Sequence, residues 1–165
     1  MLKLENALEK WLGNYCGLVI LGIGSSLRKD DAVGVEILRR LVGRVPKNVR
    51  LIDCEAVPEK FTGKIRLLKP SHVLLIDAAD LGCEAGEARL VPVNKIAGVA
   101  LSTHAMPLYM LAEIVKKSVE AKVVLLGVQP KDVGFGEGLS SETEKAVERV
   151  VEVLVNVLNK ATVDD

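Results

Sequence analysis

A continuous apolar run, Gly17-Leu18-Val19-Ile20-Leu21-Gly22, lies near the start of the sequence. Glycine bounds the run on both sides and no polar residue interrupts it, which is typical of a β-strand buried on both faces. Two later segments, 72–76 and 122–128, are predicted to be apolar strands of the same kind. Such strands occur in parallel sheets that are covered by helices on both sides. The sequence therefore predicts an α/β fold.

The segments between these strands have the periodicity of helices. Apolar residues at 33, 37, 38, 41 and 42 predict a helix over 32–42, with Asp30 or Asp31 as its N-cap. The other expected elements are helices at 60–68, 106–117 and 141–160, a short strand at 49–52, and an edge strand of opposite direction at 87–93. We expect a three-layer α/β/α arrangement around a mostly parallel sheet, in a single domain over 1–165 whose residues 1–14 form a helix packed on the body.

Composition excludes several classes of protein. The 165 residues are 49% hydrophobic, and 22 Lys and Arg balance 22 Asp and Glu. A net charge of zero gives no electrostatic case for binding nucleic acid or an anionic membrane. The apolar runs are far shorter than the roughly 20 residues that span a bilayer, and no export signal is visible. Three cysteines without a Cys-x-x-Cys pair indicate reduced thiols, so we expect a cytoplasmic protein.

Acidic side chains follow several of the predicted strands. Asp30 and Asp31 follow the first strand, Asp53 the second and Asp77 the next, while His104 lies in a loop that reaches the same edge. Ligands bind beyond the carboxyl ends of strands in open parallel sheets. Carboxylates and an imidazole suit a borderline divalent metal, and three such ligands leave positions open for a substrate. This edge is therefore the predicted site.

Each of these residues also has a structural interpretation. Asp30 fits an N-cap better than a ligand, and Asp31 fits either. Asp77 could instead accept backbone hydrogen bonds in the turn after its strand. His104 could instead be a structural residue at the start of a helix. His72 begins a strand and is expected at the surface.

Two other kinds of site are poorly supported. The turn Gly22-Ile23-Gly24-Ser25-Ser26-Leu27 follows a strand, but Leu27 replaces the third glycine of a dinucleotide-binding loop. Adjacent aspartates at a helix start would also repel a pyrophosphate. There is no Gly-x-Ser-x-Gly motif, and no cysteine has a context that suggests an activated thiolate.

Five segments resemble motifs of the nickel–iron hydrogenase maturation endopeptidases, and most closely the version that processes the large subunit of formate-hydrogenlyase-type hydrogenases (hydrogenase 3). They are Gly22 to Gly34, Leu75 to Asp80, Ser102 to Leu108 together with Leu126 to Pro130, and Asp53-Cys54-Glu55-Ala56-Val57-Pro58-Glu59. The resemblance covers about 17–158. Two positions depart from it, because Ser25 replaces the usual Asn and Cys54-Glu55 replaces Gly-Gly.

The resemblance implies a twisted five-stranded sheet between helices. It also implies an enzyme that removes a C-terminal extension from the precursor of the nickel-containing large subunit. By position, the family's metal-contacting residues correspond to Asp31, Asp77 and His104. The metal would be the precursor's own nickel, with no permanently bound metal required. Asp30 and Asp53 remain candidates for a catalytic base.

A second function is compatible with the same residues. A chaperone that checks the precursor for nickel, without cutting it, would need the same three ligands. The endopeptidase would shorten the large subunit, whereas the chaperone would bind the precursor and leave its length unchanged.

Overall fold

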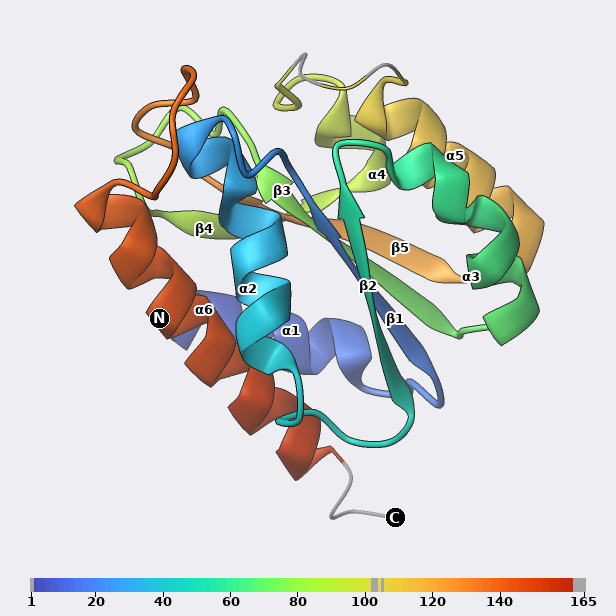
Figure 1. Ribbon diagram of the computed structural model, residues 1–165. Coiled ribbons are helices and arrows are strands. Elements are labelled where there is room, and N and C mark those ends of the chain that lie inside the picture. The colour runs from blue at the N-terminus through green and yellow to red at the C-terminus, as the bar shows by residue number, and fades with distance from the viewer. Residues whose placement is uncertain (1, 102–103, 105, 162–165) are drawn as a thin grey trace.

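A five-stranded sheet forms the centre of the computed structural model, which describes residues 2–101, 104 and 106–161. The strands lie in the order β2-β1-β3-β5-β4 (Figure 1). Their bounds are β1 Leu18–Ile23, β2 Val49–Glu55, β3 His72–Ala78, β4 Ala88–Pro92 and β5 Lys122–Val128. All neighbours pair in parallel except β4, which runs antiparallel to β5 at the edge. The predicted mostly parallel sheet with one antiparallel edge strand is confirmed.

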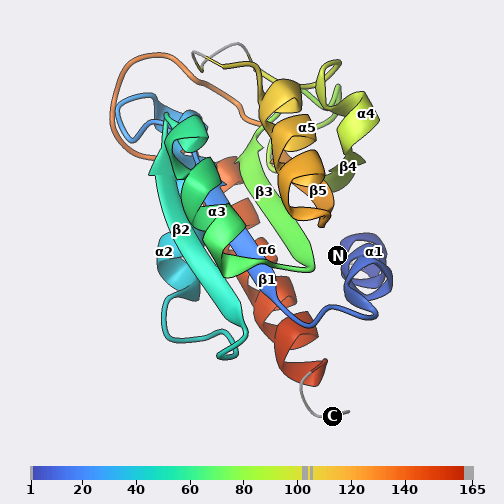
Figure 2. The ribbon, with the colours of Figure 1, turned by 90° about the vertical axis from the view of Figure 1, so that its right-hand side faces the viewer.

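Helices cover both faces of the sheet (Figures 1 and 2). One face carries α1 (Leu2–Leu12), α2 (Val33–Leu41) and α6 (Ser141–Lys160), and the other carries α3 (Thr62–Leu68), α4 (Val93–Ile96) and α5 (Leu108–Val119). Ile20 of β1 faces the first core and Val19 the second, so successive side chains of one strand enter different cores. This is why the strand is apolar at every position. Among the described residues, no helix has both the length and the apolar character needed to cross a membrane.

Several element boundaries differ from those expected. Two 3₁₀ helices, η1 (Lys29–Ala32) and η2 (Pro58–Phe61), precede α2 and α3. Asp30 and Asp31 lie inside η1, and Ala32 is the N-cap of α2 without a side-chain bond, so the expected aspartate cap is wrong. The strand predicted at 49–52 continues to Glu55, and the strand predicted at 72–76 continues to Ala78. The short helix α4 was not predicted, and the helix expected at 106–117 begins at Leu108.

The start of α2 lies against the backbone of the sheet. A Cβ atom on Gly34 would overlap the carbonyl oxygens of Ile76 and Ile23, and one on Gly22 would lie 2.7 Å from the carbonyl oxygen of Gly34. The helix therefore approaches β1 and β3 closely only because both positions are glycine. This contact also brings η1 against β3.

His72 is buried rather than at the surface, so its predicted exposure is wrong. The C-terminal end of α1 covers the beginning of β3, and His72 Nε2 donates a hydrogen bond of 3.1 Å to the carbonyl oxygen of Trp11. Its Nδ1 lies 2.9 Å from Ser71 Oγ, and the Trp11 ring meets the imidazole edge-on. Burial and the charge of Lys122 lower the pKa of His72, against a smaller opposing effect of the Trp11 carbonyl, so the folded protein holds a neutral ring.

We predict that Gly34→Ala lowers the free energy of unfolding by about 3 kcal/mol, because α2 must shift away from the sheet. Urea unfolding measures this change. The control is Gly63→Ala, since a Cβ at Gly63 on α3 meets no atom within 4 Å. That variant should match or exceed the wild type, because alanine favours helix over glycine. Equal stability of the Gly34 variant and the wild type would contradict the close contact.

We also predict that His72 makes stability depend on pH. Its pKa is lowered on folding from the ordinary value of 6.5, so the unfolded chain binds the proton more readily. The stabilisation is complete above that value and is lost as the pH falls below it. His72→Gln should remove this acid-side loss between about pH 5 and pH 6.5 in urea unfolding at a series of pH values. An unchanged pH profile in the variant would show that folding does not lower the pKa of His72.

Candidate metal-recognition and active site

The structure brings Asp77 and His104 into direct contact. Asp77 lies near the carboxyl end of β3, and His104 lies in the loop before α5. His104 Nε2 donates a hydrogen bond of 2.8 Å to Asp77 Oδ2, and the two side chains are only 2% and 4% exposed. The other oxygen of Asp77, Oδ1, accepts from the Ala78 amide. A carboxylate and an imidazole that are 27 positions apart thus form one buried pair.

Asp31 is the third predicted residue, and its carboxylate is only half satisfied. It lies on η1 and is 1% exposed. Its Oδ2 accepts a hydrogen bond of 2.8 Å from the Ser25 amide. Its Oδ1 is buried and has no hydrogen-bond partner among the described residues. A buried carboxylate oxygen without a partner is costly, so Oδ1 of Asp31 is an available acceptor for a further donor or for a cation.

The charges of the three residues act on one another. Burial raises the pKa of Asp77 and the charge of Asp31 raises it further, although the bond from His104 opposes both. Burial, the largest single effect, would lower the pKa of His104, and the hydrogen bond to Asp77 opposes it. The charges of Asp77, Asp31 and Glu59 act in the same direction, so this pKa is raised. The Asp77–His104 pair therefore keeps its protons to higher pH than the separate groups would.

Asp30, next to Asp31, has a different environment. Its Oδ2 accepts from the amides of Lys131 and Asp132 and from Ser140 Oγ, and its Oδ1 accepts from the Ser140 amide at 2.7 Å. Burial would raise the pKa of Asp30, but these hydrogen bonds together hold it below its ordinary value. Asp30 thus fastens the segment before α6 onto η1. Its acceptor sites are occupied, which leaves it poorly suited to act as a base.

Asp53 lies outside the buried group. Its Oδ1 accepts from the Glu55 amide, its Oδ2 lies 3.9 Å from Arg39 Nε, and its side chain is 37% exposed. Cys54, the next residue, is buried, and burial raises the pKa of its thiol to about 12. A thiol with that pKa is protonated at neutral pH and is not a nucleophile.

Glu59 is a residue near this site to which the sequence analysis gave no role. It lies on η2, which follows β2, and its charge contributes to the raised pKa of His104. Its Oε2 is buried and has no hydrogen-bond partner in the described part of the chain. The signal was present in the sequence, since Pro58-Glu59 ends the motif that begins at Asp53.

The described side chains do not form a complete metal site. Within 2–101, 104 and 106–161, no group of three or more His, Cys, Asp or Glu is arranged to hold a metal ion by itself. Asp77 and His104 are instead bonded to each other. His104 also lines a small cavity of about 190 Å³, with Ala100, Met106 and Tyr109 among its neighbours.

Comparison with known proteins identifies the family. A model of the family described as hydrogenase maturation protease matches residues 35–157. A putative hydrogenase maturation protease of Methanocaldococcus jannaschii is 33% identical, over 94% of this chain and 96% of its own length. The hydrogenase 3 maturation protease of Escherichia coli is 34% identical, over 82% of this chain and 87% of its own length.

The fold agrees with solved structures of such proteins. The crystal structure of a [NiFe] hydrogenase maturation protease, HycI, from Thermococcus kodakarensis superposes with a TM-score of 0.85 at 35% identity. The match covers 93% of this chain and 99% of that one. Because the family model spans most of the sequence and the sequence identities extend over nearly whole chains, the chain belongs to the hydrogenase maturation protease family and is an endopeptidase.

Proposed function

We propose that this endopeptidase removes the C-terminal extension of a nickel-loaded [NiFe] hydrogenase large-subunit precursor. We further propose that Asp31, Asp77 and His104 recognise the precursor's nickel. The observation that carries the proposal is the buried Oδ1 of Asp31, which has no partner in the described chain. A cation carried by the substrate would satisfy this oxygen. The relative of known structure with a TM-score of 0.85 is named a [NiFe] hydrogenase maturation protease, which supports this substrate class.

The chemistry of the three side chains suits a metal that arrives with the substrate. Two carboxylates and an imidazole are ligands that a borderline divalent ion accepts. Asp77 and His104 hold each other in place in the free enzyme, and so the site stays ordered before the substrate binds. An empty precursor offers no cation to Asp31. Selectivity for the loaded precursor follows, since only that form compensates the buried carboxylate.

The reaction itself is hydrolysis of one peptide bond. Water adds to the scissile carbonyl carbon, the C–N bond breaks, and the proton from water passes to the leaving amine. Recognition of the nickel fixes the precursor so that the scissile bond lies beside the carboxylates and His104, and fixed geometry of this kind lowers the barrier. We place the reaction in the cytoplasm, in keeping with three free cysteines.

We predict that His104→Ala and Asp77→Asn each reduce processing by on the order of 100-fold or more, because each removes a recognition group. The assay mixes purified protein with nickel-loaded precursor and follows the shortened large subunit on a gel. Circular dichroism checks that both variants stay folded. Precursor that is bound but never shortened by the wild type would favour a nickel-checking chaperone. Normal processing by either variant would count against the assigned site.

The adjacent aspartates allow a sharper test. We predict that Asp31→Asn abolishes processing with little effect on stability, since it removes a charge that only the substrate compensates. Asp30→Ala should instead lower the free energy of unfolding by on the order of 3 kcal/mol, because several donors then lose their acceptor. Processing and urea unfolding are measured on both variants. The reverse assignment, with stability lost at Asp31 and not at Asp30, would overturn the interpretation.

A further inference from the structure

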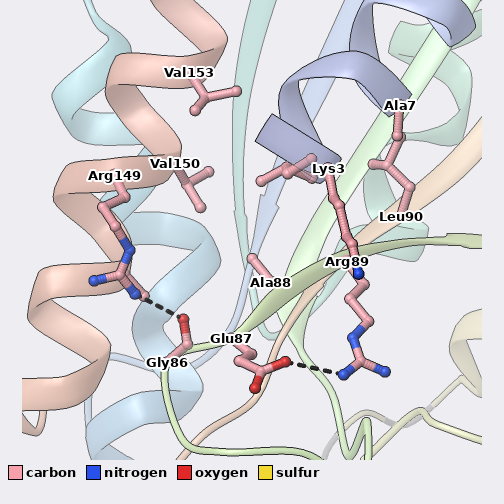
Figure 3. A pocket seen from close by; sticks show the side chains of 12 residues that line it. Lys3, Ala7, Gly86, Glu87, Ala88, Arg89, Leu90, Arg149, Val150 and Val153 are labelled. Atoms are coloured by element: carbon pink, nitrogen blue, oxygen red, sulfur yellow. Dashed lines mark hydrogen bonds and ion pairs between the residues drawn. The ribbon is translucent and has the colours of Figure 1, made fainter. Parts of the chain in front are cut away.

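A groove that the proposed site does not use lies between α1, β4 and α6 (Figure 3). Its volume is about 700 Å³, within the range of binding sites in proteins. The floor is built of small and apolar side chains, among them Ala7 of α1, Ala88 and Leu90 of β4, and Val150 of α6. A floor of this kind accommodates a polypeptide backbone without steric conflict.

One wall of the groove is the outer edge of β4. The Gln129 amide donates to the Glu87 carbonyl, so Glu87 faces β5. Val128, which is opposite Ala88, uses its carbonyl oxygen for the Ala79 amide on the other side of β5. In an antiparallel ladder, the backbone N–H and C=O groups of successive residues face the partner strand and the opposite side in turn. Since Glu87 faces β5, the N–H and C=O groups of Ala88 and Leu90 face away from β5. An edge that presents such groups is a template for an added strand.

The groove has an excess of positive charge. Lys3, Arg89 and Arg149 line it, and Glu87 is the one acid among its lining residues. Glu87 pairs with Arg89 at 2.9 Å. The Arg149 guanidinium donates a hydrogen bond to the carbonyl oxygen of Gly86. The Lys3 ammonium forms no ion pair with the described residues. Figure 3 shows Arg149 on α6 and Lys3 on α1, on opposite sides of the groove. These two charges favour an acidic occupant.

One end of the groove lies at the same end of the sheet as Asp77, because Ala88 of β4 and Ala78 of β3 both pair with Val128. The Gly86 amide, at one end of the groove, donates to the Gln129 carbonyl. The side-chain oxygen of Gln129 accepts from the Leu81 amide, in the loop that follows β3. The loop that follows β3 and the segment that enters β4 are therefore joined through Gln129.

We propose that the groove binds an extended, acidic segment of the hydrogenase large-subunit precursor as an added strand beside β4. This inference rests on the proposed function and adds a second contact with the same substrate. Main-chain hydrogen bonds to Ala88 and Leu90 hold the segment, and Lys3 and Arg149 select for carboxylate side chains. The nickel contact and this contact then act together, which raises the affinity for one precursor molecule.

The first test reverses one charge. Lys3→Glu should raise KM for the nickel-loaded precursor about fivefold, while kcat stays unchanged, because Lys3 takes no part in the reaction. The control is Lys116→Glu on α5, an exposed lysine on the opposite face of the sheet, which should leave KM unchanged. The same KM for wild type, Lys3→Glu and Lys116→Glu would overturn the charge selection.

The second test removes one backbone donor. Ala88→Pro deletes an N–H that faces away from β5, so the pairing of β4 with β5 survives while the added strand loses a hydrogen bond. Ala88→Ser keeps the N–H and the size of the side chain, and serves as the matched control. Thermal unfolding verifies that both variants fold, and the precursor's Kd is measured directly. We expect Ala88→Pro to weaken binding about tenfold relative to Ala88→Ser.

The outcomes separate this inference from the function on which it rests. Equal Kd values for folded Ala88→Pro and Ala88→Ser, with normal cleavage by both, would overturn the groove and leave the endopeptidase function standing. Failure of the wild type to shorten the nickel-loaded precursor would overturn the proposed function itself. A Kd that still differs between the two variants in that case would support the groove as a binding surface.

Discussion

The close contact between Gly34 of α2 and the backbones of Ile23 and Ile76 is the constraint on which the rest of the structure depends. Without side chains at this contact, α2 begins directly over the sheet where β1 and β3 end. The 3₁₀ helix η1 precedes α2 immediately, so Asp31 is brought near Asp77, whose pKa it raises. The geometry of the candidate site is thus set by a packing contact between backbone groups that lie outside it.

Burial of several acidic groups near one end of the sheet must be balanced by specific interactions. Asp30 is satisfied by hydrogen bonds from the segment before α6, and Asp77 by His104 and the Ala78 amide. Asp31 and Glu59 each keep one buried oxygen without a partner in the described chain. A fold tolerates such groups where function requires them, because the stability comes from elsewhere, here from two apolar cores.

The parts of the fold that depend on local pattern could be predicted from the sequence. The apolar run in β1 and the weak alternation in β4 indicated a buried and an edge strand, and the structure has both. The candidate site residues follow the ends of parallel strands, and the rule that ligands bind at these ends placed Asp77 and Asp31 at the same edge.

The features that the sequence could not show depend on contacts between distant segments. His72 is buried because α1 covers it. Asp30 does not cap α2, because its carboxylate accepts a hydrogen bond from the amide of Ser140, which is 110 positions away. Glu59 was passed over for the same reason, since its nearness to His104 arises only in the folded chain.

The bonds made by Asp30 also have a dynamic consequence. They join η1 to the amides of Lys131, Asp132 and Ser140, in a connection that has little other regular structure. Segments linked in this way open cooperatively, so the connection and η1 form one unit of local unfolding rather than two. Any fluctuation that frees the connection therefore also displaces Asp31, so the lifetime of the Asp31 position depends on amide hydrogen bonds that its neighbour Asp30 accepts.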